Sequence, residues 1–243
     1  SERVLRWEAL LNARDLDGLP TVHGPIRPGA IVRSDALFRL TSAGQAALVA
    51  HGVRTVIDMR TPGGVAARPD PLLGTSGVVH AHIALQSEAM WRSIAPGTDR
   101  VTFDTTMLAL AASRFAAVAE AIADAPMGGV LIHCEAGKDR TGLIVILLLD
   151  LVGTPADAIA ADYTLTAVGL TGLYAELVAD PANFDRRARL EEEARCRPEV
   201  ALAIVDTLHR RHGGAEAYLR AGGASDASIE RIRGRMLDQR STA

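Results

Sequence analysis

With 243 residues, 48% of them hydrophobic, the chain is long enough to bury one sizeable core, so we expect a single domain over residues 1–243 rather than two equal domains. The formal net charge of −3 excludes a general attraction to nucleic acid or to anionic membranes, and positive charge should instead gather in one pocket. The two cysteines, Cys134 and Cys196, imply no disulfide framework, and a reduced protein suits thiol chemistry.

The sequence shows no pattern typical of membrane insertion or of a signal peptide. Its longest apolar run, Leu143 to Leu149, is too short to span a bilayer. Residues 1–7, SERVLRW, lack the apolar core of a signal peptide. We therefore expect a soluble protein with no stable membrane insertion and no nucleic-acid partner, cytoplasmic or secreted without a recognisable signal peptide.

The first part of the chain alternates turns, strands and a helix. Turn residues punctuate residues 12–28 and predict a loop-rich entry. Thr41 has the position of an N-cap for a helix that runs to about His51 and is closed by Gly52. Residues 61–77 are rich in Gly and Pro and predict a surface loop. Strands are predicted near residues 31–33, over residues 53–59 and over residues 78–85.

Asp58 and Arg60 lie at the end of the strand predicted over residues 53–59. They stand at its carboxyl end, where open α/β sheets place their ligands. An Asp–Arg pair that only closes the strand end explains them equally well, and both interpretations stay open. Further on, an Ala- and Leu-rich run predicts one helix from about Asp104 to Asp124, with the Asp104 carboxylate near its positive end.

Residues 130–142, VLIHCEAGKDRTG, carry a buried strand abruptly into a tight loop and then into a helix. Such a loop aims successive backbone N–H groups at one point, and the helix dipole adds partial positive charge there. The sequence therefore predicts a site for phosphate or another oxyanion. The predicted phosphate-binding residues are Glu135, Ala136, Gly137, Lys138, Asp139 and Arg140.

The residue types in this loop favour covalent chemistry. A helix N-terminus flanked by Lys138 and Arg140 should hold the Cys134 sulfur as the nucleophilic thiolate. The planar fork of Arg140 can bind two phosphoryl oxygens, most tightly as they spread in the transition state. The Thr141 hydroxyl is placed to hydrogen-bond the sulfur and help it leave when a cysteinyl-phosphate is hydrolysed. Neither a metal nor another cofactor is expected.

Helices dominate the rest of the chain. Residues 141–152 predict a helix that is apolar nearly all round and hence central and buried, closed by Gly153. Thr154-Pro155 marks a fresh helix start, and residues 161–197 should be mostly helical with a solvated charged face. Further helices are predicted over residues 198–211, over residues 215–219, and from a cap at Ser225 to Leu237.

The pattern His133-Cys134-x5-Arg140-Thr141 resembles the signature of the cysteine-based tyrosine and dual-specificity phosphatase superfamily, and HCxAGKDRTG is similar to a bacterial subfamily of atypical tyrosine phosphatases. Residues 12–20, 33–37, 54–60 and 218–220 are also similar to that subfamily, so the resemblance covers most of the chain. It implies an α/β fold with a central, mainly parallel twisted sheet flanked by helices. It further implies a helical insertion after the central helix, over about residues 161–213, which can form a lid.

The resemblance also implies roles for individual residues. Asp139 is expected to be the general acid that protonates the leaving oxygen, although a carboxylate that only hydrogen-bonds loop amides is the alternative. A matching Asp-x-Arg lies near the active site in the family, which favours a supporting role for Asp58 and Arg60. The wider superfamily takes its acid from a mobile loop upstream of the cysteine, where Asp99 is a weak candidate. His133 is expected to orient the loop or to be a plain structural histidine.

The implied activity is hydrolysis of phosphomonoesters through a cysteinyl-phosphate intermediate. The expected substrate is a phosphotyrosyl protein, with broader activity on phosphoserine, phosphothreonine or phosphoinositides, and a phosphoinositide phosphatase is the alternative. Lys138 should add charge at the pocket wall and hold a second phosphate, whereas Glu135 would repel polyanionic headgroups unless it points away. A sulfurtransferase of rhodanese type and a module that only binds phosphorylated partners remain as other classes.

Overall fold

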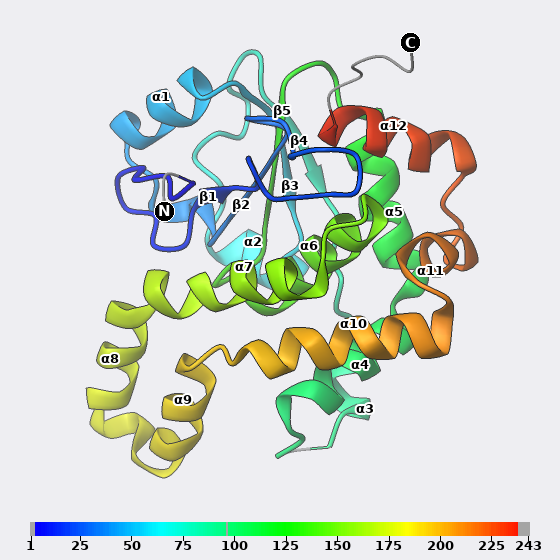
Figure 1. Cartoon of the computed structure of the whole chain (residues 1–243). Coiled ribbons are helices and arrows are strands. Elements are labelled where there is room, and N and C mark those ends of the chain that lie inside the picture. The colour runs from blue at the N-terminus through cyan, green and yellow to red at the C-terminus, as the bar shows by residue number, and fades with distance from the viewer. Residues whose placement is uncertain (1–2, 96, 238–243) are drawn as a thin grey trace.

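The computed structural model describes residues 3–95 and 97–237, so the ends of the domain expected over residues 1–243 lie outside the described part. Within it, the strands form one five-stranded sheet in the order β1-β2-β5-β3-β4. They are β1 (Arg14–Asp15), β2 (Ile31–Ser34), β3 (Val53–Asp58), β4 (Val79–His82) and β5 (Gly129–His133). All pair in parallel except β1, which is antiparallel to β2. The predicted mainly parallel α/β sheet is confirmed (Figure 1).

The register brings the carboxyl ends of the three central strands to one edge of the sheet. Ser34 of β2 and Asp58 of β3 both pair with His133 of β5. The residues that follow these strands, among them Met59 and Cys134, therefore leave the sheet side by side. Parallel sheets bind ligands at this edge because the loops and helix N-termini converge there.

Helices cover both faces of the sheet (Figure 1). In the described part the α-helices are α1 (Ser42–Ala50), α2 (Pro62–Ala67), α3 (Glu88–Ser93), α4 (Arg100–Leu110), α5 (Ala112–Asp124), α6 (Asp139–Leu151), α7 (Ala156–Gly169), α8 (Thr171–Ala179), α9 (Arg187–Ala194), α10 (Pro198–His212), α11 (Ala215–Ala221) and α12 (Asp226–Met236). The short 3₁₀ helices are η1 (Leu37–Arg39) and η2 (Pro181–Arg186). Strand residues alternate between two buried clusters: Val130 and Ile132 face the larger one and Leu131 the smaller.

α6 is the central buried helix that its apolar sequence predicted. Every residue from Leu143 to Leu149 is buried, and the helix packs against β5, α4, α7, α10 and α11. Because it is covered on all sides, α6 is rigid, and its N-terminus is fixed relative to the sheet edge. The helix begins at Asp139, two residues before the predicted start at Thr141.

The helices from α7 to α10 form an arm beside the sheet. α7 and α10 pack against each other, and α8, η2 and α9 join their ends at a distance from the sheet (Figure 1). The helical character predicted for residues 161–197 is confirmed. The predicted start at Thr154-Pro155 is shifted by one residue, because Pro155 is the N-cap of α7 rather than its first helical residue.

The helix predicted from Asp104 to Asp124 is wrong at its start and in its continuity. The Asp99 side chain accepts a hydrogen bond from the Thr102 N–H at 3.0 Å, so α4 begins at Arg100 and Asp104 lies inside it. The chain then breaks at Ala111, and α4 and α5 meet at a bend of 76°. In the described part no single helix has the length and apolar character needed to cross a membrane; this bent pair meets both conditions only when taken together.

Side-chain caps decide several other boundaries. Thr41 and Ser225 cap α1 and α12, as predicted, and each accepts a hydrogen bond from the N–H three residues on. The loop predicted over residues 61–77 was wrong in part. Thr61 caps the short helix α2, and Pro62 takes its first position, where a missing N–H costs nothing.

Candidate active site

The loop between β5 and α6 depends on Gly137 for its shape. Gly137 has φ +65°, a conformation that other residues adopt with strain. A Cβ at this position would lie 2.3 Å from the Ser34 carbonyl oxygen and 2.7 Å from the Asp35 nitrogen. The loop therefore rests directly on the backbone that follows β2, and only glycine permits this contact.

The backbone N–H groups of the loop are free to bind a ligand. From Glu135 to Thr141 these groups donate no hydrogen bond to any of residues 3–95 and 97–237. The first such bond of α6 runs from the Gly142 N–H to the Lys138 carbonyl at 2.8 Å. Free N–H groups at the positive end of a buried helix are the physical requirements of an oxyanion site. The residues predicted to bind phosphate supply these groups.

The carbonyl groups of the loop, in contrast, are fixed by side chains from the start of the chain. The Asn12 amide donates to the Ala136 and Gly137 carbonyls at 3.0 and 3.1 Å, and the Arg33 Nη2 donates to Gly137 at 2.8 Å. The backbone N–H groups of Leu11 and Asn12 donate in turn to the Asp35 carboxylate. Because these donors hold the carbonyls on one side of the loop, its N–H groups are left on the other.

A buried ion cluster supports Arg33 from behind. Asp162 of α7 is paired with Arg3, Arg14 and Arg33 at 2.9, 3.1 and 3.0 Å, and its side chain is fully buried. Burial raises the pKa of Asp162, but the arginines outweigh this effect and hold the pKa well below its usual range. Burial and the nearby Arg14 lower the pKa of Arg33 to about 10, so Arg33 stays charged at neutral pH.

Cys134 lies at the base of the loop, directly after β5. Its side chain is 2% exposed and is not part of any disulfide. The imidazole Nδ1 of His133 lies 3.0 Å from the Cys134 carbonyl oxygen, and Nε2 lies 3.8 Å from Asp58. Burial lowers the pKa of His133 despite the nearby Asp58 carboxylate. His133 thus contacts the backbone of the predicted nucleophile.

Asp58 and Arg60 pair with each other rather than with the loop. The Arg60 Nη2 and Nε donate to the Asp58 carboxylate at 2.7 and 2.9 Å, and Nη1 donates to the Arg68 carbonyl at 2.8 Å. Burial raises the pKa of Asp58, but Arg60 and His133 outweigh it and lower the pKa. These contacts match the strand-closing interpretation. Among the described residues, their link to the loop runs through His133.

Arg140 and Thr141 occupy the first turn of α6. The Arg140 Nη1 makes a long hydrogen bond of 3.4 Å to the Met59 carbonyl, and the Met59 N–H donates to the His133 carbonyl at 2.9 Å. The guanidinium therefore lies beside the end of β5, from which Cys134 emerges. The Thr141 hydroxyl is buried and has no hydrogen-bond partner in the described part of the chain.

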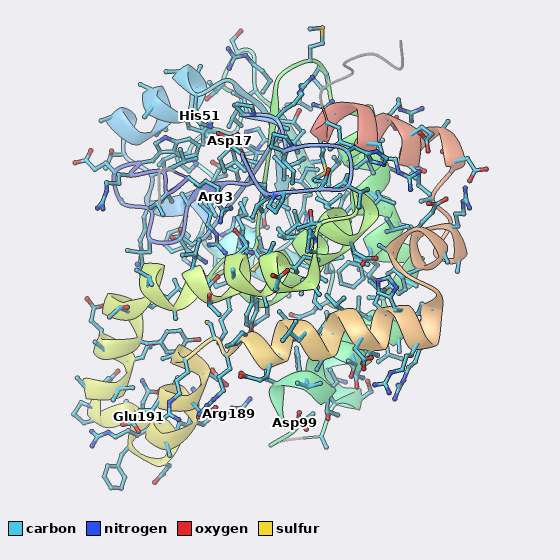
Figure 2. The ribbon with its side chains drawn as sticks, viewed as in Figure 1. Arg3, Asp17, His51, Asp99, Arg189 and Glu191 are labelled. Atoms are coloured by element: carbon cyan, nitrogen blue, oxygen red, sulfur yellow. The ribbon has the colours of Figure 1, made fainter. Side chains whose placement is uncertain are left out.

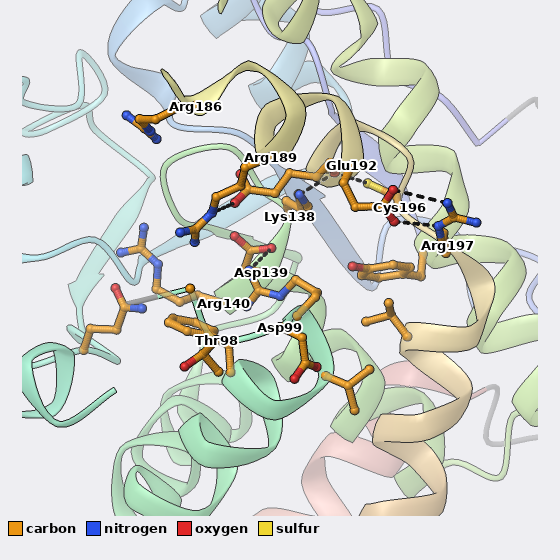
Figure 3. A pocket seen from close by; sticks show the side chains of 18 residues that line it. Thr98, Asp99, Lys138, Asp139, Arg140, Arg186, Arg189, Glu192, Cys196 and Arg197 are labelled. Carbon is orange, nitrogen blue, oxygen red and sulfur yellow. Dashed lines mark hydrogen bonds and ion pairs between the residues drawn. The ribbon is translucent and has the colours of Figure 1, made fainter. Parts of the chain in front are cut away.

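A cavity of about 780 Å³ opens above the loop (Figure 3). Lys138, Asp139 and Arg140 line its loop side, whereas Cys134 is covered and does not line it. The opposite walls come from the start of α4 and from the arm. Figure 2 shows one residue of each wall, Asp99 and Arg189, toward the same end of the molecule. The cationic residues of the lining are Arg100, Lys138, Arg140, Arg186, Arg189 and Arg197, against the carboxylates of Asp99, Asp139, Glu192 and Glu193. Positive charge predominates, as the sequence analysis expected for one pocket.

Asp139 faces the cavity, where Arg100 of α4 holds it. The Arg100 Nη1 lies 3.1 Å from the Asp139 Oδ1, which is buried and accepts no aligned hydrogen bond from the described residues. Asp99, the weaker acid candidate, is exposed and caps α4, and its hydrogen bonds from Thr102 lower its pKa. Its carboxylate is therefore committed to the helix start.

Lys138 lines the cavity wall, as predicted, but its amine is bound by the arm, and Glu135 points away from the cavity. The Lys138 amine donates to the Tyr174 hydroxyl at 3.0 Å and to the Glu193 carbonyl at 2.7 Å, so it ties the loop to α8 and α9. Glu135 pairs with Arg68 at 2.8 Å and is not among the cavity-lining residues. Its repulsion of a polyanionic substrate is thereby removed.

The residues that fix the loop and hold Asp139 were not predicted from the sequence. Asn12 and Arg33 fall in segments that resemble the family, which was the only available signal for them. For Asp162 and Arg100 the sequence offered none, because each acts on residues far away in the chain.

The fold and the loop define a phosphatase of the cysteine-dependent class, and comparison with known proteins identifies the family. The profile of the tyrosine phosphatase family matches residues 5–238, so the chain belongs to that family. This confirms the resemblance on which the expected activity rests.

Curated relatives agree with this assignment. A tyrosine-protein phosphatase of Nostoc commune is 33% identical, covering 85% of this chain and 74% of the relative. The triple specificity protein phosphatase PtpB of Mycobacterium tuberculosis is 28% identical, covering 93% of this chain and 96% of the relative. A putative tyrosine-protein phosphatase of Cupriavidus necator is 32% identical, covering 65% and 61%.

Proposed function

We propose that this enzyme hydrolyses phosphomonoesters through a cysteinyl-phosphate intermediate and that phosphotyrosyl proteins are its main substrates. The observation that carries the proposal is the run of free N–H groups from Glu135 to Thr141, directly after Cys134 and at the N-terminus of α6. The name of the mycobacterial relative supports a broader range, including phosphoserine, phosphothreonine or phosphoinositides. A phosphoinositide phosphatase is the alternative main activity.

The first step transfers the phosphoryl group to the enzyme. The loop N–H groups bind the phosphoryl oxygens. The Arg140 fork, which the described residues hold only by the 3.4 Å bond to Met59, turns over the loop to join them. The Cys134 sulfur forms a bond to phosphorus as the bond to the leaving oxygen breaks. Asp139 gives its proton to that oxygen, and the leaving group departs as a neutral alcohol or phenol.

The second step regenerates the thiolate. Water attacks phosphorus and gives a proton to the Asp139 carboxylate, while the bond from phosphorus to sulfur breaks and inorganic phosphate forms. The Thr141 hydroxyl, which is buried without a partner in the described residues, donates a hydrogen bond to the departing sulfur. His133, fixed by its contact to the Cys134 carbonyl, keeps the sulfur in place.

Residues 161–213 form a lid within a single domain under this proposal. Two contacts support it: Lys138 joins the loop to Tyr174 and Glu193 of the arm, and residues near the end of α9 line the cavity. A lid that closes on the loop excludes water from the first step. The location, cytoplasmic or secreted, stays a prediction from the sequence.

The test is covalent labelling during turnover of an aryl phosphate. The native enzyme should release about one equivalent of phenol in a burst and hold phosphate on Cys134. Cys134→Ser should abolish both, and Cys196→Ser, which leaves Cys134 in place, should still form the labelled intermediate. Hydrolysis by Cys134→Ser would contradict the mechanism. Tight phosphate binding without product release would favour the binding module, and thiocyanate formation from thiosulfate and cyanide the sulfurtransferase.

A further inference from the structure

α4 carries a buried carboxylate that the two steps above do not use. Asp104 is 2% exposed and does not line the cavity, yet it stands one turn from Arg100, the residue that holds Asp139. The guanidinium binds two carboxylates in different ways. Its Nε and Nη2 donate side-on to Asp104, and its Nη1 faces the Asp139 Oδ1 at 3.1 Å.

This sharing matters because a general acid must hold its proton at the working pH. If Arg100 paired with Asp139 alone, its full positive charge would favour the ionised Asp139 carboxylate, which cannot donate a proton. The closer, bidentate pair with the Asp104 carboxylate neutralises most of the positive charge of Arg100. The contact to Asp139 also lacks hydrogen-bond alignment, so the Oδ1 keeps room for a proton.

We propose that Asp104 is a positioning residue: acting through Arg100, its carboxylate neutralises the guanidinium and leaves Asp139 able to protonate a poor leaving group. The inference rests on the proposed role of Asp139. Burial raises the pKa of Asp104 to about 7 even though Arg100 lowers it, so Asp104 is ionised over the alkaline half of a pH profile.

Other charged or titratable groups lie around Asp139 and also affect how readily it keeps its proton. They are Arg100 and Asp104 of α4, Lys138 and Arg140 beside it, Tyr163 of α7, Tyr174 of α8, and Arg189, Glu193 and Cys196 from α9 and its end. Most of these groups are neutral or already paired with another side chain or a backbone carbonyl. Lys138 is bound by Tyr174 and Glu193, Arg189 pairs with Glu193 at 2.8 Å, and burial raises the pKa of Tyr163, which stays neutral. Replacing Asp104 therefore acts on Asp139 mainly through Arg100, whose charge is then no longer neutralised.

The experiment compares pH profiles of kcat/KM for two aryl phosphates. Phenyl phosphate, a poor leaving group, needs the acid, whereas a dinitrophenyl phosphate does not. Asp104→Asn should lower the pH of the basic limb for phenyl phosphate by about one unit and reduce its turnover about tenfold above that limb. Arg100→Gln should move the limb the opposite way. The double variant should return it toward that of the native enzyme.

The activated substrate and a distant pair serve as controls. Full turnover of dinitrophenyl phosphate by Asp104→Asn shows that this variant is folded and that Cys134 works. For Arg100→Gln, whose side chain lines the cavity, circular dichroism shows the fold instead. Asp206→Asn breaks an Arg–Asp pair of the same i,i+4 spacing on the exposed face of α10 and should leave both profiles unchanged.

Four outcomes separate support for the inference from its possible failures. Shifts of the phenyl phosphate limb in opposite directions for Asp104→Asn and Arg100→Gln support the inference. No shift, or shifts in the same direction, overturns it even if Asp139→Asn slows phenyl phosphate. If Asp139→Asn leaves that substrate unaffected, the acid assignment fails and this inference fails with it. Hydrolysis that survives Cys134→Ser would instead refute the proposed function itself.

Discussion

Replacing Asn12 with alanine tests whether the oxyanion loop is held in shape from the other end of the chain. The Asn12 amide makes two hydrogen bonds to loop carbonyls, and its Oδ1 accepts one from the charged Arg14 at 2.7 Å. Neutral bonds contribute about 1 kcal/mol each and a bond to a charged group about 1.5–3 kcal/mol. Because Asn12 is 3% exposed, water does not replace them, and we expect unfolding free energy to fall by about 3–5 kcal/mol.

The effect on the loop is measured separately from the effect on stability. For a chain of this size the loss lowers Tm by about 10 °C, which a thermal melt detects. If ordering the freed loop costs about 1.4 kcal/mol, inorganic phosphate should inhibit about tenfold more weakly. Asn183→Ala is the matched control, since its amide also donates to a carbonyl, that of Leu177, but far from the loop. A destabilised Asn12→Ala enzyme with native phosphate inhibition would refute the argument.

Two further substitutions probe the same scaffold. Gly137→Ala should abolish turnover while the protein stays folded, because a Cβ 2.3 Å from the Ser34 carbonyl forces the loop off β2; native kcat with normal circular dichroism would contradict this. Asp162→Asn should lower the free energy of unfolding at pH 7 by about 3–5 kcal/mol, because three arginines lose their buried partner. Since the folded pKa of Asp162 is lowered, its contribution is present above about pH 4 and is lost as pH falls below it, so urea titrations should show the difference shrinking by about 1 kcal/mol per pH unit there. A difference that stays constant to pH 2 would exclude Asp162 as the source.

The sequence was informative where the cause of structure is local. The cap at Thr41 and the buried helix after the loop each follow from neighbours within a few residues. The same reasoning failed at Asp104, because an Ala- and Leu-rich run carries no signal for a break at Ala111. The Asp99 cap was the available clue, since a side chain that accepts the N–H three residues on fixes a helix start.

The chemistry of the loop could be predicted from its residues, but its support could not. Lys138 illustrates the difference, because a lysine beside a phosphate site predicts added positive charge in the pocket. Lys138 does line the cavity, but its amine also binds the Tyr174 hydroxyl and the Glu193 carbonyl, 36 and 55 residues further along the chain. Contacts over such separations depend on how helices fold back, which no local pattern encodes.

The distribution of charge around the loop follows from this division of roles. Arg33 and Lys138 lie at the loop, but Arg33 donates hydrogen bonds to a loop carbonyl and Lys138 donates to the arm. Arg100 is shared between two carboxylates, and within residues 3–95 and 97–237 the Arg140 guanidinium makes only one long bond, to a backbone carbonyl. A guanidinium with one long bond can move at small cost, whereas Arg33, Lys138 and Arg100 would each have to give up several hydrogen bonds. We therefore expect Arg140 to follow the phosphoryl group through the transition state, while these three cations keep the loop and its surroundings in place.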